Sequence, residues 1–424
     1  MRKVIKNATV ITMDEKRENK YEVIDIVIDD STITDLVKDY QGDVDLIIDG
    51  TNKIVMPGLI NTHTHLGMSM FKATNDSLTL MEWLQDKIWP IEDNMTDDDT
   101  YYSVLMALIE MIKTGTTCSN DMYFNCDGAL KAIKELKVRS VFTKTLADIN
   151  GDGEDRIKEF MRIYNKNKDN PLITFTIAPH AFYTCNEKYL KRCSELATEL
   201  NLPVHMHYNE NRGEIEGTIK EYGKTPLEVL KSTGLINNKL ILAHATFVSD
   251  EELKEFKDKY ISFAHNPLSN LNLGCGIADI KKYKNYVNIS LGTDGVGSGN
   301  NLNMFYHMSL VDLLQKGKYE DPTVFNSYEV LKIATINGAK ALGLENIIGS
   351  IEKGKKADII MLDLNDILTE PNVDIINNIV HNALNSVDMT MINGEILLKD
   401  KKLCLPINEK ELINKIYEII DRLT

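Results

Sequence analysis

The chain has 424 residues, of which 43% are hydrophobic, and its 63 Asp and Glu residues against 48 Lys and Arg residues give a formal net charge of −15. This length allows a large core, as two or three domains or as one barrel with a side domain. The negative charge would repel a nucleic-acid backbone over most of the surface, so we expect no nucleic-acid partner.

The chain gives no sign of export or of membrane insertion. Lys6, Asn7, Thr9 and Thr12 interrupt the apolar residues near the N-terminus, which is unlike a signal peptide. No stretch approaches the ~20 consecutive apolar residues of a membrane-spanning helix. Six scattered cysteines without a C-x-x-C pair are typical of reduced thiols. We expect a soluble, cytoplasmic protein that does not contact membranes.

Residues 1–56 contain short runs with alternating apolar positions, at 4–13, 25–33 and 45–50, separated by turns rich in Asp and Gly. This pattern predicts a small antiparallel unit. Residues 349–424 contain strand patterns again, at 353–364 and 387–398. We expect this second segment to complete a small β-sandwich domain with the first one, and to end in a helix.

Between these segments, residues 57–348 alternate short apolar runs with longer amphipathic stretches, which is typical of repeated βα units. Eight parallel strands close a barrel, so the predicted fold is α/β, a (β/α)8 TIM barrel carrying the small β domain. The eight runs are 58–65, 116–124, 138–146, 173–180, 203–210, 240–245, 260–266 and 287–295.

Polar residues follow nearly every one of these runs, and a barrel's active site lies at that end of its strands. His63 and His65 share one face because strand side chains alternate with a period of two. With His207 and Asp294 they give three imidazoles and a carboxylate, a set suited to Zn²⁺, with iron as an alternative. His205 is an alternative ligand. We favour His207, because Glu210 follows it three residues later. We interpret His205 as a structural group deeper in the barrel.

Several segments together resemble the amidohydrolase superfamily and, more narrowly, the methylthioadenosine/S-adenosylhomocysteine deaminases. The resemblance covers nearly the whole chain, and its motifs occur in the family's order. It rests on MPGLINTHTH, the spacing of His207 and Glu210, AHATFVSDEE, AHNPLSNLNLGCG and GTDGVGSGNNLNMF. The other zinc deaminase class is excluded because no P-C-x-x-C motif occurs.

The resemblance implies a hydrolytic deaminase that converts the adenine 6-amino group of 5'-methylthioadenosine, S-adenosylhomocysteine or adenosine and releases the inosine-type product and ammonia. It implies one metal ion per chain, because the fourth run ends at His180 where two-metal relatives carry a lysine; Lys144 sits one strand too early for that role.

The resemblance also implies the catalytic roles. Glu210 would act as the general acid and base. Asp294 would bind the metal and accept a proton from water, and His244 would orient the hydroxide. Glu214 and Glu216, in the same stretch, are interpreted as surface groups.

The resemblance also implies the contacts with the nucleoside. Glu92, in the segment 79–93, would accept hydrogen bonds from the ribose diol. His180 would contact a purine ring nitrogen. Trp83, Trp89 and Phe71 are candidates for an apolar wall, or for ordinary core residues.

The sequence departs from the family at two positions that bear on the substrate. Lys144 stands where relatives carry an arginine that holds substrate, and a lysine lacks the bidentate fork. Asn211 stands where a threonine is usual. Arg156, expected on a loop, is an alternative anion contact. The preferred adenosine derivative therefore stays open.

Other functions also stay open. A guanine or cytosine deaminase or a triazine-type hydrolase would share the metal but not the pocket, and a barrel that has lost catalysis would act as a scaffold. The sequence also leaves a homo-oligomer open.

Overall fold

The eight apolar runs form the strands of a barrel in the computed structural model, which describes residues 1–74 and 77–424. The fourth run is divided into two short strands, β9 and β10. All pairing within the barrel is parallel. The strands are β6 (Leu59–Thr64), β7 (Thr116–Tyr123), β8 (Arg139–Leu146), β9 (Ile173–Phe175), β10 (Ala178–Pro179), β11 (Val204–Tyr208), β12 (Leu240–His244), β13 (Ile261–His265) and β14 (Asn288–Leu291).

Backbone hydrogen bonds close the barrel at both seams between β6–β10 and β11–β14. The amide of His205 donates to the carbonyl of Ile177 at 2.9 Å, and the amide of Thr293 donates to that of His63 at 3.1 Å. The (β/α)8 prediction is therefore confirmed. Every residue of β7 and β8 is buried, as expected for strands of a parallel barrel that are covered on both faces.

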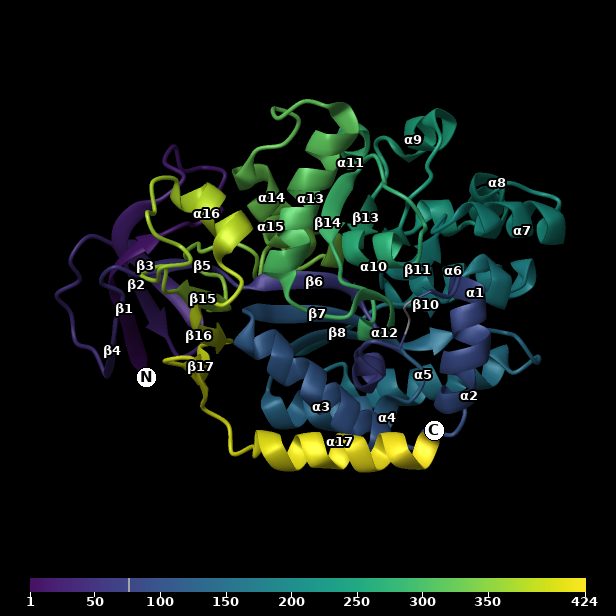
Figure 1. The fold of residues 1–424 in the computed structure, drawn as a ribbon, viewed down its shortest axis with the longest axis horizontal. Helices are drawn as coiled ribbons and strands as arrows, with labels where there is room; N and C mark the ends of the chain where they lie inside the picture. Colours follow the sequence, from purple (N-terminus) through teal and green to yellow (C-terminus); the bar gives the residue numbers. More distant parts are fainter. Residues whose placement is uncertain (75–76) are drawn as a thin grey trace.

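Helices surround the barrel and follow its strands along the chain (Figure 1). The helical segments before the last one are η1 (Leu66–Phe71), α1 (Leu80–Trp83), η2 (Leu84–Ile88), α2 (Trp89–Glu92), α3 (Asp97–Lys113), α4 (Cys126–Leu136), α5 (Gly153–Asn167), η3 (Phe182–Thr184), α6 (Glu187–Leu200), α7 (Arg212–Tyr222), α8 (Pro226–Ser232), η4 (Leu235–Asn237), α9 (Asp250–Phe256), α10 (Pro267–Asn272), α11 (Ile280–Tyr283), α12 (Val296–Gly299), α13 (Met304–Tyr319), α14 (Ser327–Ala334), α15 (Ile336–Leu342) and α16 (Ile375–Asn382).

The two ends of the chain join in one nine-stranded sheet beside the barrel, drawn purple and yellow in Figure 1. Its hydrogen-bonded order is β18-β17-β16-β15-β5-β1-β2-β3, and β4 pairs with β1. The strands are β1 (Arg2–Val10), β2 (Glu22–Asp29), β3 (Thr32–Val37), β4 (Leu46–Asp49), β5 (Ile54–Pro57), β15 (Ile359–Leu362), β16 (Val387–Ile392), β17 (Glu395–Lys399) and β18 (Lys402–Leu403).

The N-terminal part of this sheet differs from the antiparallel unit that we predicted. The pairs β1–β2 and β2–β3 are antiparallel, but β4 and β5 both pair with β1 in parallel. In turn β5 pairs with β15 in antiparallel fashion, which joins the N-terminal strands to the C-terminal ones. The alternating pattern identifies strands but does not determine their direction, because pairing depends on the connections between them.

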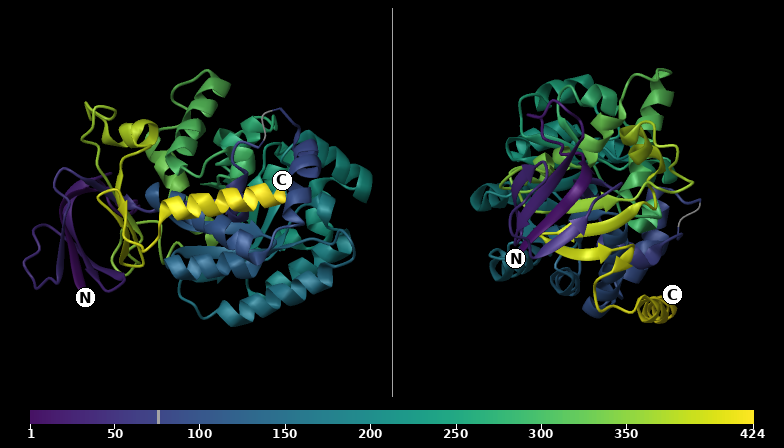
Figure 2. Two further views of the ribbon diagram at one scale, coloured as in Figure 1. Left: turned by 60° about the horizontal axis from the view of Figure 1, so that its bottom comes forward. Right: turned by 90° about the vertical axis from the view of Figure 1, so that its left-hand side faces the viewer.

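The last helix, α17 (Glu409–Leu423), leaves the sheet and lies along the barrel helix α3 (Figures 1 and 2). Its apolar face buries Leu412, Ile416 and Ile419. The guanidinium of Arg422 lies 2.5 Å from the carboxylate of Asp99 on α3. The helix thus ties the end of the chain to the barrel. Among the described residues, no helix is long and apolar enough to cross a membrane.

Candidate functional site

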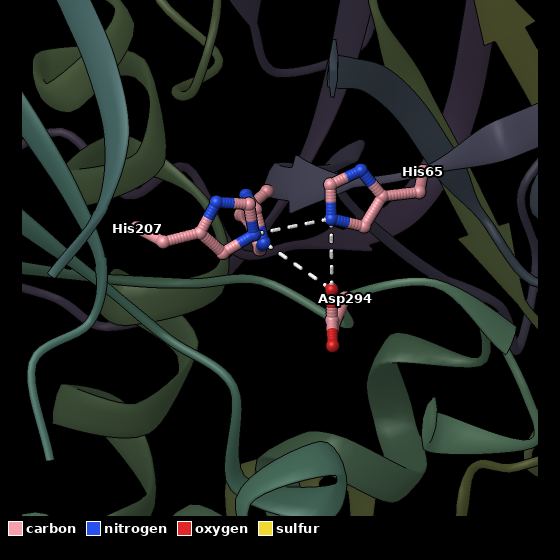
Figure 3. A group of neighbouring side chains, drawn as sticks. His65, His207 and Asp294 are labelled. Carbon is pink, nitrogen blue, oxygen red and sulfur yellow. Dashed lines mark hydrogen bonds and ion pairs between the residues drawn. The ribbon is translucent and has the colours of Figure 1, made fainter. Parts of the chain in front are cut away.

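Three histidines and one aspartate meet at the rim where the barrel strands end. His63 lies in β6 and His65 directly after it, His207 lies in β11, and Asp294 follows β14. One donor atom from each side chain lies within 4.8 Å of the other three. Nε2 of His65 lies 3.3 Å from Nε2 of His207 and 3.2 Å from Oδ1 of Asp294. Figure 3 shows these three side chains pointing toward one another.

In each of the three imidazole rings, Nδ1, the nitrogen that does not face the centre, already has a polar partner. Nδ1 of His65 lies 2.6 Å from the carbonyl oxygen of Met122, and Nδ1 of His207 lies 2.8 Å from that of His180. A carbonyl only accepts, so both Nδ1 atoms carry a proton and both Nε2 atoms face the centre. Nδ1 of His63 lies 2.9 Å from Nε2 of His205. His205 therefore lies behind the group and orients His63.

Two serines hold the carboxylate of Asp294. The hydroxyls of Ser269 and Ser298 both donate to Oδ2, at 2.7 and 2.5 Å, which leaves Oδ1 facing the histidines. The backbone of Asp294 has a φ of +61°, in the left-handed region that residues other than Gly, Asn and Asp seldom adopt. The sequence analysis did not identify these serines. In the sequence, the only sign of such a contact is the position of Ser298, four residues after Asp294.

This donor set fits a small divalent cation. Donors 2.0–2.1 Å from a tetrahedral zinc ion lie about 3.3 Å apart. Here Nε2 of His63 and Nε2 of His65 lie 3.3 and 3.2 Å from Oδ1 of Asp294. Nε2 of His65 also lies 3.3 Å from Nε2 of His207. Nε2 of His63 is buried and has no hydrogen-bond partner among the described residues. A buried lone pair without a partner is costly unless a cation or a proton occupies its site.

The protonation of the rings is consistent with ligands. Burial lowers the pKa of His63 to about 3 and that of His207 well below its usual value, so both rings are neutral, as a metal requires. Burial is the largest single influence on His65 and lowers its pKa, but the hydrogen bond and charge of Asp294, the carbonyl of Met122 and the charge of Asp121 together outweigh burial and raise the pKa to about 9. A cation at the centre would displace that proton.

Two further groups border the four ligands. His244, at the end of β12, has its Nδ1 fixed at 2.8 Å from Oδ1 of Asn270, while its buried Nε2 has no hydrogen-bond partner within the part of the chain that the structure describes. Oε1 of Glu210 lies 3.7 Å from Nδ1 of His244 and accepts a weak hydrogen bond from the thiol of Cys275. Burial raises the pKa of Glu210. A buried carboxyl with a raised pKa is suited to exchange protons near neutrality.

Glu214 is not the surface group that we predicted. It is buried, and its Oε2 accepts a hydrogen bond from the backbone amide of Glu210 at 2.7 Å. Burial raises its pKa to about 7. Asn211, the N-cap of α7, accepts a hydrogen bond from the amide of Glu214. The departure at Asn211 therefore affects the helix that positions Glu214. Glu216 is exposed, as we predicted.

A cavity of about 60 Å³ adjoins the ligand group. Glu92 and His180 line it together with Trp83 and Trp89, whereas Phe71 lies in the core. Oε1 of Glu92 accepts a hydrogen bond from the hydroxyl of Tyr123 at 2.8 Å. Burial raises the pKa of Glu92 to about 7.

Lys144 and Arg156 lie outside this cavity and are both paired. Nζ of Lys144 is 2.8 Å from the carboxylate of Glu159 and donates to the carbonyl of Phe124. Nε of Arg156 is 2.7 Å from Asp152. Arg156 lies on α5 rather than on the loop that we predicted, because the helix begins at Gly153.

Comparison with known proteins extends this description. A model of the amidohydrolase family matches residues 54–397 of the chain. A 5-methylthioadenosine/S-adenosylhomocysteine deaminase of Thermoanaerobacter pseudethanolicus is 39% identical over 98% of this chain and 97% of its own. A 5'-deoxyadenosine deaminase of Methanococcus aeolicus is 41% identical over 88% of this chain and 87% of its own.

Solved structures share the fold. An adenosine deaminase of Xanthomonas campestris with bound zinc is 29% identical, covers 99% of this chain and 98% of its own, and superimposes with a TM-score of 0.95. An atrazine chlorohydrolase of Arthrobacter aurescens complexed with zinc has a TM-score of 0.91 at 23% identity, covering 99% of this chain and 100% of its own. At that identity the likeness concerns the fold alone.

Proposed function

The chain belongs to the amidohydrolase family, and from this premise we propose that it is a metal-dependent deaminase of adenosine-type nucleosides. The proposal rests on one observation: the group of His63, His65, His207 and Asp294 borders a cavity that also contains Glu92 and Glu210. A hydrolytic centre and a carboxylate suited to a sugar diol thus share one space. The relatives named as nucleoside deaminases support the same reading.

His63, His65, His207 and Asp294 would hold the cation, which we propose to be one Zn²⁺ per chain, with Fe²⁺ as the alternative. Three imidazoles and a carboxylate are ligands that zinc accepts. When bound, the cation would act as a Lewis acid that makes water a competent nucleophile at neutral pH.

The protein groups around it would manage the protons. Glu210 delivers a proton to N1 of the adenine ring, which makes C6 more electrophilic, and later carries a proton to the leaving ammonia. Asp294 accepts a proton from the attacking water, and Nε2 of His244 orients that water. The C6–O bond forms and the C6–N bond breaks, which yields ammonia and the inosine-type product.

Different residues of the cavity would bind the purine and the ribose of the substrate. His180 would contact the purine, and Glu92 would accept hydrogen bonds from the two ribose hydroxyls through its two oxygens. Lys144 was predicted to bind substrate as well. Its pairing with Glu159 argues for a structural role in the unliganded protein.

Ammonia release from a panel of substrates tests the proposal. With metal-loaded protein we expect 5'-deoxyadenosine, 5'-methylthioadenosine or adenosine to have a kcat/KM at least ~10²-fold above that of guanine or cytosine, because free bases cannot reach Glu92 while they occupy the metal site. Faster turnover of guanine or cytosine would identify a base deaminase. Displacement of a halide from a chlorotriazine without deamination would identify a triazine-type hydrolase, and no turnover at all would favour a scaffold.

A further inference from the structure

An outer hollow adjoins the nucleoside cavity on the side away from the metal ligands. The two spaces share five lining residues, Trp89, Glu92, Tyr123, Phe124 and Tyr183. None of the four predicted ligands lines the outer hollow. A nucleoside that places its reacting ring at the ligands and its ribose diol at Glu92 therefore directs its 5' substituent into this hollow.

Acidic side chains dominate the outer hollow. Among the described residues, two cations line it, Lys144 and Arg156, against five carboxylates: Glu92, Asp93, Asp152, Asp155 and Glu159. The formal charges of the lining sum to −3. In a concave site this excess produces a negative potential that attracts cations and repels anions.

Both cations already have acidic partners. Lys144 is buried, and both its ion pair with Glu159 and its hydrogen bond to the carbonyl of Phe124 are 2.8 Å long. Arg156 is held by Asp152, and its guanidinium lies 5.6 Å from the ring centre of Phe124. A carboxylate on the ligand would have to compete with acids that are already in place.

Cations neutralise only some of the carboxylates that line the outer hollow. Asp155 pairs with Lys158, which does not line the hollow. Within residues 1–74 and 77–424, no cation lies within 4.0 Å of the carboxylate of Asp93, which is exposed. Glu92 is reserved for the ribose diol under the proposed function. Negative charge thus remains where a 5' substituent would end.

We infer that the outer hollow selects adenosine derivatives whose 5' substituent is neutral or cationic and discriminates against those that end in a carboxylate. The inference rests on the proposed function and specifies its substrate class. An adenosine thioether that ends in an ammonium group would find acceptors at Asp93 and Asp155. A thioether that ends in a carboxylate would meet repulsion and cations that already have acidic partners.

Two thioethers of equal chain length test this inference, one ending in an ammonium group and one in a carboxylate, with 5'-methylthioadenosine as the neutral reference. At low ionic strength we expect kcat/KM for the ammonium compound to exceed that for the carboxylate by about tenfold or more. The ratio should shrink as salt is raised to about 0.5 M, because salt screens these charges. A ratio at or below one in low salt would overturn the inference.

The variant Glu159→Gln gives a second test, since it releases Lys144. We expect it to raise the ratio of kcat/KM for the carboxylate compound to that for 5'-methylthioadenosine by about tenfold. Glu154→Gln is the matched control, because Glu154 lies on the same helix but outside the hollow. Equal effects of the two substitutions would contradict a local role.

Asp93→Asn provides an independent check if Glu159→Gln fails to fold. It should lower the preference for the ammonium compound without raising turnover of the neutral reference. Turnover of 5'-methylthioadenosine with no preference for charge would overturn this inference and leave the proposed function intact. No ammonia from any nucleoside would overturn the proposed function, and this inference with it.

Discussion

At the scale of single residues, Glu210 combines burial, closeness to His244 and a raised pKa. If it carries protons between water, ring and leaving group, its removal should affect the chemistry and not the metal. We expect Glu210→Gln to retain the metal and to lower kcat by ~10² or more. Steady-state kinetics on protein of measured metal content would show this. The exposed Glu216→Gln should behave as wild type, and undiminished turnover in Glu210→Gln would assign the proton transfer to another group.

The two serines that bind Asp294 suggest a separate prediction for metal affinity. Without their hydroxyls, Oδ2 of Asp294 loses both donors and the carboxylate can rotate away from the histidines. We expect the double variant Ser269→Ala and Ser298→Ala to weaken metal binding by about 10–100-fold. Competition with a chelator measures the affinity. Ser309→Ala, which removes a hydroxyl near His381, serves as the control; equal losses in both proteins would argue against a specific role.

Individual residues also show how much of the site could be predicted from the sequence. His63, His65, His207 and Asp294 were predicted from their places at strand ends, and the structure brings them together. Glu214 was misjudged, because whether a carboxylate on a first helical turn faces solvent or the barrel depends on how that helix docks. For the same reason the ion pair between Lys144 and Glu159 could not be foreseen, since it needs α5 to lie beside β8.

At the scale of elements, the barrel strands were predictable because short runs with apolar residues alternate with longer amphipathic stretches, which is typical of βα units. The parallel pairing of β4 with β1 was not, since the local pattern contains no information on direction. The division of the fourth run into β9 and β10 also escaped prediction. The lining of the cavity was predicted in part, with Trp83 and Trp89 in it and Phe71 in the core.

A buried ion pair links the barrel to the nine-stranded sheet. Nε and Nη2 of Arg139, at the start of β8, bind the two carboxylate oxygens of Asp358, next to β15, at 2.6 and 3.0 Å. Their side chains are 5% and 1% exposed, so either charge alone would be buried without compensation.

Removing one partner of this pair should therefore be costly. We expect Asp358→Asn to lower the free energy of unfolding by roughly 3–5 kcal/mol, measured by denaturant titration. Asp127→Asn breaks an exposed ion pair with Arg162 and should cost no more than about 1 kcal/mol. Equal losses in the two variants would show that the contact of Arg139 with Asp358 contributes nothing special.

At the scale of the whole molecule, both ends of the chain support the barrel that carries the site. Strand β5 connects the sheet strands of the two ends and leads directly into β6, which carries His63. The C-terminal helix α17 packs on α3 on the outside of the barrel (Figure 2). The four donors thus come from three strand ends that only the closed barrel brings within bonding distance of one ion.

Anomalous diffraction from crystals of the purified protein, recorded on both sides of the zinc absorption edge, tests the central claim most directly. The account predicts one peak per chain, bonded to Nε2 of His63, His65 and His207 and to a carboxylate oxygen of Asp294. The peak should be absent from His207→Ala, together with the deaminase activity. A metal-free centre in fully active protein, or a metal bound elsewhere while these four side chains remain hydrogen-bonded to one another, would contradict it.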